Sequence, residues 1–155
     1  MENEEISEQE PEIEEKYEDK FLKHIESELK WPFFKNNLLK AAYIIGAYFE
    51  RVEYLQRKEL NTMGLQKKIR PLISSMDKNK LIKIFNNANE VNFAIKGAKR
   101  RDYLSYTRLR QKIEELIVSF ENYNEDIDSN EIFLAFMTGY DSGYRFNKKL
   151  KKEKE

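Results

Sequence analysis

The residues of this chain that could do chemistry are mainly positively charged. Three basic runs occupy its middle: QKKIRP (66–71), KGAKRRDY (96–103) and YTRLRQK (106–112). Lysine and arginine neutralise phosphates whatever the base sequence. Tyr103 and Tyr106 lie beside the arginines and could stack on unpaired bases, although Tyr106 also fits an apolar helix face. The runs therefore favour binding to a nucleic-acid backbone, and a solvated or protein-docking face is the alternative.

The candidate nucleic-acid-binding residues come from these runs and from the polar flank of an earlier helix. On a helical wheel of about 100° per residue, Arg101, Arg108 and Lys112 form a basic ridge beside the apolar seam of their helix. The complete set is Arg51, Arg57, Lys58, Lys67, Lys68, Arg70, Lys99, Arg100, Arg101, Arg108 and Lys112.

Groups that indicate catalysis or a metal site are missing. Cysteine is absent, which excludes disulfides, thiol nucleophiles and cysteine zinc sites. His24 has no second imidazole to complete a metal site, and a solvated surface position explains it better than a catalytic base. The stretch DIDSNEI (126–132) begins like a calcium loop, but Glu131 and Met137 replace the required glycine and bidentate glutamate. We therefore expect no catalytic residue, no metal and no cofactor, and we expect that the protein is not an enzyme.

Composition and apolar periodicity indicate a helical domain. The chain has 155 residues, 40% apolar and 36% charged, and its five glycines and three prolines are too few for an all-β domain. The periodicity predicts helices at about 13–29, 33–60, 78–95, 101–123 and from about 129 onward, and a connection at 61–76 with a short helix on one side of Pro71. Asp77 and either Asp128 or Ser129 are the expected N-caps. The predicted fold class is all-α, a compact bundle of about five helices.

The helix predicted at 33–60 has one apolar face. The apolar residues of this face recur three or four positions apart, which is the spacing of an amphipathic helix. They are Phe34, Leu38, Ala41, Ile45, Tyr48, Val52 and Leu55.

Charge is unevenly distributed although the formal net charge is zero. Residues 1–30 hold twelve Asp or Glu against four Lys, whereas residues 51–112 hold sixteen bases against five acids. A basic centre behind an acidic leader indicates a polyanionic partner, and lysine-rich solvated helices are the alternative. We expect an acidic disordered leader at 1–12, one helical-bundle domain at 13–150 and a charged tail at 151–155.

The N-terminus is acidic and lacks the pattern of a secretory signal. No apolar run approaches the roughly 20 residues of a membrane-spanning helix. With the absence of cysteine, these features predict a cytoplasmic protein that does not contact membranes.

Two segments place an alanine four residues before a glycine. Ala42 precedes Gly46 in LLKAAYIIGAYFERVEYLQR (38–57), and Ala135 precedes Gly139 in NEIFLAFMTGYDSGYRF (130–146). A glycine inside a helix costs about 1 kcal/mol relative to alanine, so two such glycines need a packing reason. We expect these two helices to cross tightly in the core.

The same two segments carry a family resemblance. AAYIIGAYFERVEYLQR, with its downstream Gln56, and NEIFLAFMTGYDSGYRF resemble the C-terminal helical part of the large subunit of type I-B CRISPR effector complexes, over about residues 33–147. In such systems that part can also be made as a separate small subunit. The resemblance implies a non-catalytic helical bundle, present in several copies beside other subunits, that supports the guide–target RNA–DNA heteroduplex and the displaced single-stranded DNA.

The family offers no compact residue motif, so the candidate binding residues rest on the charge pattern alone. The acidic leader departs from the family and could screen or regulate the basic face. Two alternatives remain open: a small subunit of a type III CRISPR complex and a helical adaptor that docks a protein partner.

Overall fold

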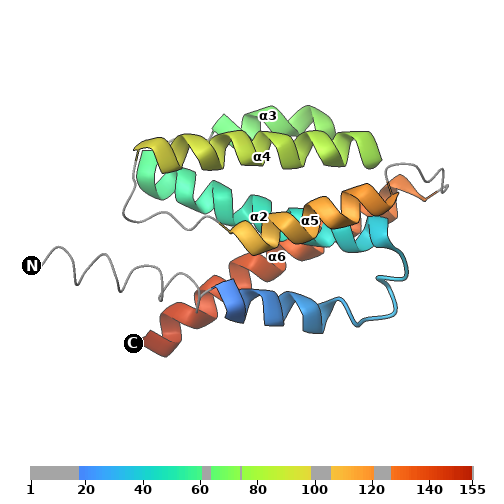
Figure 1. Cartoon of the computed structure of the whole chain (residues 1–155), viewed down its shortest axis with the longest axis horizontal. Helices are drawn as coiled ribbons and strands as arrows, with labels where there is room; N and C mark the ends of the chain where they lie inside the picture. Colours follow the sequence, from blue (N-terminus) through green and yellow to red (C-terminus); the bar gives the residue numbers. More distant parts are fainter. Residues whose placement is uncertain (1–17, 61–63, 74, 99–105, 121–126, 155) are drawn as a thin grey trace, which may run out of the picture.

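The computed structural model describes residues 18–60, 64–73, 75–98, 106–120 and 127–154. All regular structure in these ranges is helical, which confirms the predicted all-α bundle (Figure 1). The elements are a helix at residues 18–28, α2 (Asn37–Leu60), α3 (Gly64–Ile73), α4 (Lys78–Ala98), α5 (Thr107–Phe120) and α6 (Ser129–Lys154). None of these helices is both long and apolar enough to cross a membrane.

Side-chain caps set the starts of three helices. The carboxylate of Asp77 accepts a hydrogen bond of 2.8 Å from the backbone N–H three residues ahead, at the start of α4. Asp128 accepts one of 3.0 Å from the N–H two residues ahead, at the start of α6. Both predicted N-caps are confirmed. Asn36 caps α2 in the same way at 2.9 Å, so α2 begins after Asn36 and not at the predicted residue 33.

Pro71 lies inside α3, which corrects the prediction of a short helix on one side of the proline. A proline removes one backbone donor and normally ends a helix. Here Ile69 is buried before the proline and Ile73 is partly buried after it, and both pack against the core. α3 therefore continues past Pro71 to Ile73, with apolar side chains packed against the core on both sides of the proline.

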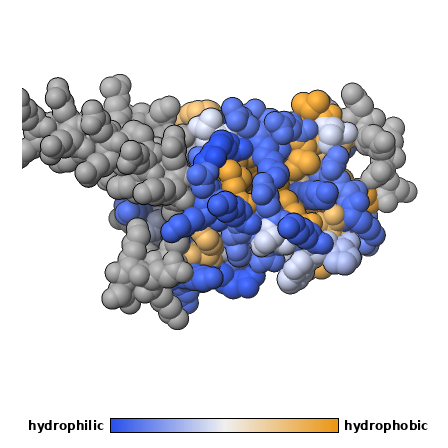
Figure 2. Space-filling view, turned by 60° about the horizontal axis from the view of Figure 1, so that its bottom comes forward, coloured by the Kyte–Doolittle hydropathy of each residue, from blue (hydrophilic) through white to orange (hydrophobic). Residues whose placement is uncertain are grey.

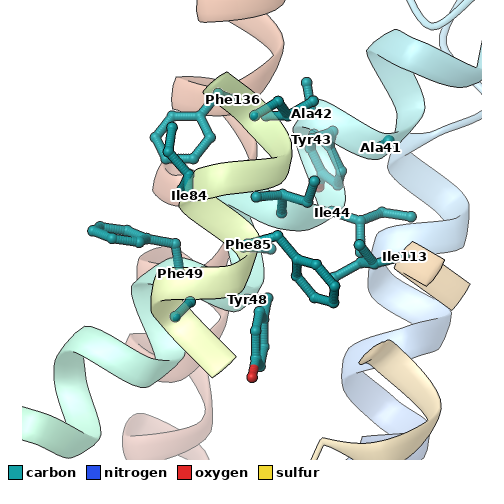
Figure 3. Packing of buried hydrophobic residues seen from close by; sticks show 14 of the residues in the cluster. Ala41, Ala42, Tyr43, Ile44, Tyr48, Phe49, Ile84, Phe85, Ile113 and Phe136 are labelled. Carbon is teal, nitrogen blue, oxygen red and sulfur yellow. The ribbon is translucent and has the colours of Figure 1, made fainter. Parts of the chain in front are cut away.

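α2 is the central helix of the bundle. It contacts α4, α5 and α6, and every residue from 41 to 53 is buried. Figure 3 shows Tyr43, Ile44 and Phe49 of α2 among side chains from the surrounding helices. The expected apolar face is buried, but the remaining faces are buried too, so the prediction of a one-sided helix was incomplete.

α2 and α6 approach to backbone contact at two glycines. A Cβ atom on Gly46 would lie 2.0 Å from the carbonyl oxygen of Phe136, and one on Gly139 would lie 1.8 Å from the carbonyl oxygen of Tyr43. Any side chain larger than hydrogen would therefore collide with the opposite backbone. The predicted tight crossing is confirmed.

The remaining helices cover α2 from different sides. Figure 1 shows α3 and α4 side by side along one edge of the bundle, and the helix at 18–28 along the opposite edge. Phe21 of that helix is fully buried and contacts Tyr106 and Phe146, with ring centres 6.5 and 5.2 Å away. The helix at 18–28 is thus part of the core.

Candidate functional site

The α3–α4 pair carries an excess of positive charge. Residues 64–98 hold seven Lys or Arg against two Asp or Glu. The side chains of Lys67, Arg70 and Lys83 are exposed, and no ion pair joins them to any acidic group among the described side chains. Within the described part of the chain, these cations therefore face solvent without an acidic ion-pair partner.

The C-terminal end of α2 continues this positive charge. Arg57 and Lys58 are exposed in its last turns. A Cβ on Gly64 would meet the amide nitrogen of Gln56 at 3.7 Å, so the start of α3 packs against the end of α2. We call Arg57, Lys58, Lys67 and Arg70 the α2–α3 basic surface.

A buried carboxylate links the two halves of this surface. Glu53 is 1% exposed, and its Oε1 lies 3.8 Å from Nη2 of Arg57. Glu53 and Arg70 both line a pocket of about 300 Å³ between α2, α3 and α6. Tyr140 donates a hydrogen bond of 2.8 Å to Glu53, and burial and this hydrogen bond raise the pKa of the Tyr140 phenol. The Glu53 carboxylate thus has partners inside the protein.

Arg51 does not belong to the α2–α3 basic surface, which corrects its predicted place on a polar flank. It is 2% exposed, and its guanidinium donates hydrogen bonds to both carboxylate oxygens of Glu50. Its Cζ lies 4.9 Å from the centre of the Tyr54 ring. Because α2 is packed on all sides, this position faces the interior.

Two members of the predicted basic ridge meet acidic residues of the helix at 18–28. Arg108 forms an ion pair with Asp19, and Nζ of Lys112 lies 3.2 Å from Oε1 of Glu26. The pairs are partly exposed, with the Arg108 and Asp19 side chains 47% and 49% accessible. The helix at 18–28 therefore neutralises charge on two residues that the charge pattern of the sequence predicts to bind nucleic acid.

Glu18 of the same helix caps α5. Its Oε1 accepts hydrogen bonds of 2.7 and 3.1 Å from the backbone N–H groups of Arg108 and Leu109. The residue before α5, Tyr106, has a φ of 50° and is 2% exposed. Tyr106 is thus a core residue, and its alternative interpretation as a base-stacking side chain is wrong. A tyrosine cannot cap a helix through its ring, and Glu18 supplies the missing acceptor.

His24 is half-buried, which corrects the prediction of a solvated surface histidine. Its Nε2 lies 2.7 Å from Oγ of Ser142, and its ring stacks on Phe146 with centres 5.2 Å apart. Burial lowers the pKa of His24 below its ordinary value. The sequence offers no signal for this contact, because Ser142 lies 118 positions away.

Several predicted residues lie outside the described part of the chain. They are Lys99, Arg100, Arg101 and Tyr103, the side chain of Lys68, the leader at 1–12 and the side chains of the tail at 151–155. Of the candidate residues that are described, Arg57 pairs with Glu53, and Arg70 lines the same pocket as Glu53. Lys58 and Lys67 are exposed on the same two helices, α2 and α3. Arg108 and Lys112 instead pair with acidic residues of the helix at 18–28.

Among the described residues, no group of three His, Asp or Glu side chains could hold a metal ion. The arrangement offers cations for electrostatic contact with an anionic partner. No family model matches the sequence, and neither a curated protein nor a solved structure matches it.

Proposed function

We propose that the protein is a non-catalytic helical subunit that binds nucleic-acid backbone, as single-stranded DNA or an RNA–DNA heteroduplex, through the α2–α3 basic surface. The supporting observation is the contrast between two sets of bases. Lys58, Lys67 and Arg70 are exposed without an acidic partner among the described side chains, whereas Arg108 and Lys112 are already paired. Uncompensated cations are available to replace the counterions of phosphates, and this contact is independent of base sequence.

The finer proposal is a small subunit of a CRISPR surveillance complex in the cytoplasm. Its support is the resemblance of residues 41–57 and 130–146, which form most of α2 and the first two-thirds of α6. These segments build the tight helix crossing, so the resemblance concerns the scaffold and not the basic surface. Each copy neutralises few phosphates and would bind weakly alone. Several copies held along one complex would together bind the nucleic acid much more tightly.

Fluorescence anisotropy with labelled single-stranded DNA and RNA of unrelated sequences, at two salt concentrations, tests the proposal. A variant with Arg57, Lys58, Lys67 and Arg70 all changed to Ala is compared with wild type. We expect the affinity to fall at least tenfold. The salt slope should decrease by up to about 2.8, at roughly 0.7 for each phosphate of a single strand that the variant no longer neutralises.

The matched control changes four other exposed lysines to Ala: Lys20, Lys23, Lys35 and Lys148. It removes the same charge and should bind much more tightly than the first variant. An equal decrease in affinity in both variants would show a response to net charge alone, and would contradict a defined surface. Absence of binding by the folded wild type at low salt would contradict the proposal.

The second candidate function is docking of a protein partner, and the exposed apolar side chains of α6 favour it. Phe133, Leu134 and Met137 are 36%, 55% and 37% exposed. Figure 2 shows hydrophobic patches that reach the surface between hydrophilic side chains on one face. Grouped apolar side chains on a surface are a feature of protein-binding sites. Absence of nucleic-acid binding by the folded wild type in the anisotropy experiment would favour this candidate.

A further inference from the structure

A lysine-lined cleft lies where the segment that follows the helix at 18–28, the first turn of α2 and the middle of α5 meet. Its volume is about 320 Å³, near the lower end of the range of small-molecule pockets, which is roughly 300–1,000 Å³. Lys30, Lys40 and Lys112 line it together with the acidic Glu26, and Leu29 and Leu116 supply apolar walls. The cleft therefore combines a cationic part with a hydrophobic part.

The charges of the cleft do not balance. Glu26 is bonded to Lys112 at 3.2 Å, and among the described side chains no acidic group pairs with Lys30 or Lys40. Three ammonium groups against one carboxylate leave a net charge of +2 around the open cleft. Lys40 is also half-buried, so its alkyl stem packs against the protein while its ammonium group is at the cleft. An anion that carries two negative charges would restore the balance.

We propose that this cleft binds a phosphomonoester group together with the carbon atoms next to the phosphate. A phosphomonoester carries a charge of about −1.5 to −2 at neutral pH, and its oxygens accept hydrogen bonds from lysine ammonium groups. The carbon chain next to the phosphate would contact Leu29 and Leu116. A phosphodiester carries a single negative charge and would neutralise only one of the two net positive charges of the cleft. The ligand class is therefore a small organic phosphate or the terminal phosphate of a nucleic acid.

Trp31 provides a direct reporter. It is the single tryptophan of the chain, follows Lys30 immediately and is 59% exposed. Butyl phosphate, which does not absorb in the tryptophan range, is titrated at constant ionic strength while Trp31 fluorescence is followed, and calorimetry measures the same binding independently. Butanol and dibutyl phosphate serve as control ligands. We expect saturable binding of butyl phosphate, at least fivefold tighter than that of dibutyl phosphate, and none of butanol.

Three variants test the role of each charge. Lys40→Met should weaken binding at least tenfold, and Glu26→Gln should tighten it severalfold because Lys112 is released from its carboxylate. Lys35→Met is the matched control, since Lys35 is 65% exposed and does not line the cleft, and it should bind as wild type does. Circular dichroism confirms that each variant is folded. Absence of saturable heat with the wild type, or equal binding by folded Lys40→Met and Lys35→Met, would overturn the proposal.

Oligonucleotides separate the two sources of the phosphate. Competition with butyl phosphate by a 5′-phosphorylated oligonucleotide, but not by its 5′-hydroxyl form, would assign the cleft to nucleic-acid ends. Failure of both to compete would assign it to a small molecule. The cleft shares no residue with the α2–α3 basic surface, so Lys40→Met should bind 5′-hydroxyl DNA as tightly as Lys35→Met does. The two proposals can therefore fail independently.

Discussion

His24 ends a relay of hydroxyl groups that joins α2, α6 and the helix at 18–28. Tyr43 donates a hydrogen bond of 2.8 Å to Oγ of Ser142, which lies 2.7 Å from Nε2 of His24. Burial raises the pKa of Tyr43 to about 12, so its hydroxyl keeps its proton and remains a donor. Ser142 can accept from Tyr43 and donate to His24 when Nε2 carries no proton. The relay is therefore compatible with a neutral imidazole.

The surroundings of His24 shift its pKa in opposite directions. Burial is the largest cause that lowers the pKa of His24; Glu28, 3.7 Å from Nε2, opposes it, and Arg145 and Lys149 lower the pKa further. The folded protein therefore takes up this proton at a lower pH than the unfolded chain, where histidine titrates near pH 6.5. The stability contributed by neutral His24 is complete above about pH 6.5 and is lost as the pH falls toward the folded pKa.

A His24→Gln variant tests this pH dependence, since glutamine keeps a polar side chain but does not titrate. Between about pH 7.5 and 5.5, the free energy of unfolding should decrease more in wild type than in the variant. Urea unfolding followed by circular dichroism at both pH values measures the difference. Equal decreases in the two proteins would contradict the assignment to His24.

At the scale of the elements, the crossing of α2 and α6 depends on the absence of two side chains. Helix propensity alone predicts that Gly46→Ala and Gly139→Ala each stabilise the protein by about 1 kcal/mol. The structure predicts the opposite, because the new Cβ atoms would lie 2.0 and 1.8 Å from backbone carbonyl oxygens that cannot rotate away. We expect the free energy of unfolding to fall by roughly 1–3 kcal/mol or more in each variant, as it does in overpacked cores.

Gly64→Ala is the control for this prediction. A Cβ at Gly64 would meet only the Gln56 amide at 3.7 Å, an ordinary contact, so the variant should be neutral or stabilised by up to about 1 kcal/mol. Thermal unfolding of all three variants gives the order of stability. Stabilisation of Gly46→Ala or Gly139→Ala would show that the helices are not in backbone contact.

Much of the helical architecture is predictable from local sequence, and the reasons are local. Asp77 and Asp128 cap their helices through backbone groups two or three positions away, so the caps can be read from the chain. The central position of α2 cannot be read in this way. Tyr43 and Phe49 lie outside its expected apolar face but are buried against α6, where Phe136 contacts the Phe49 ring at 5.8 Å. A helix that is buried on all sides has no single apolar face in its sequence that would reveal its central position.

At the scale of the whole molecule, contacts between distant helices decide which bases are available. Lys67 and Arg70 of the basic runs are exposed, and no described acidic side chain forms an ion pair with them. The partners of Arg108 and Lys112 could not be anticipated, since Glu26 lies 86 positions before Lys112. A charge count along the chain locates cations, but only the fold shows which are neutralised.

Under the proposed function, the acidic helix at 18–28 would compete with the nucleic-acid backbone for Arg108. It remains docked, because Phe21 and Ile25 are fully buried, but the Asp19–Arg108 pair is half exposed and can exchange partners. Such a pair contributes about 0–1 kcal/mol to stability. Asp19→Asn should thus leave the unfolding midpoint nearly unchanged, raise the affinity for single-stranded DNA and increase the salt slope by about 0.7, as expected when one more phosphate is neutralised.

Asp141→Asn is the matched control for this last prediction. It adds the same net charge and releases Arg145, whose Nε lies 2.9 Å from Asp141 on the exposed side of α6. Anisotropy titrations over a range of salt concentrations compare the two variants with wild type. A larger slope for Asp19→Asn alone would show that the helix at 18–28 limits access to Arg108. Identical slopes would mean that net charge, and not the position of the released arginine, determines the affinity.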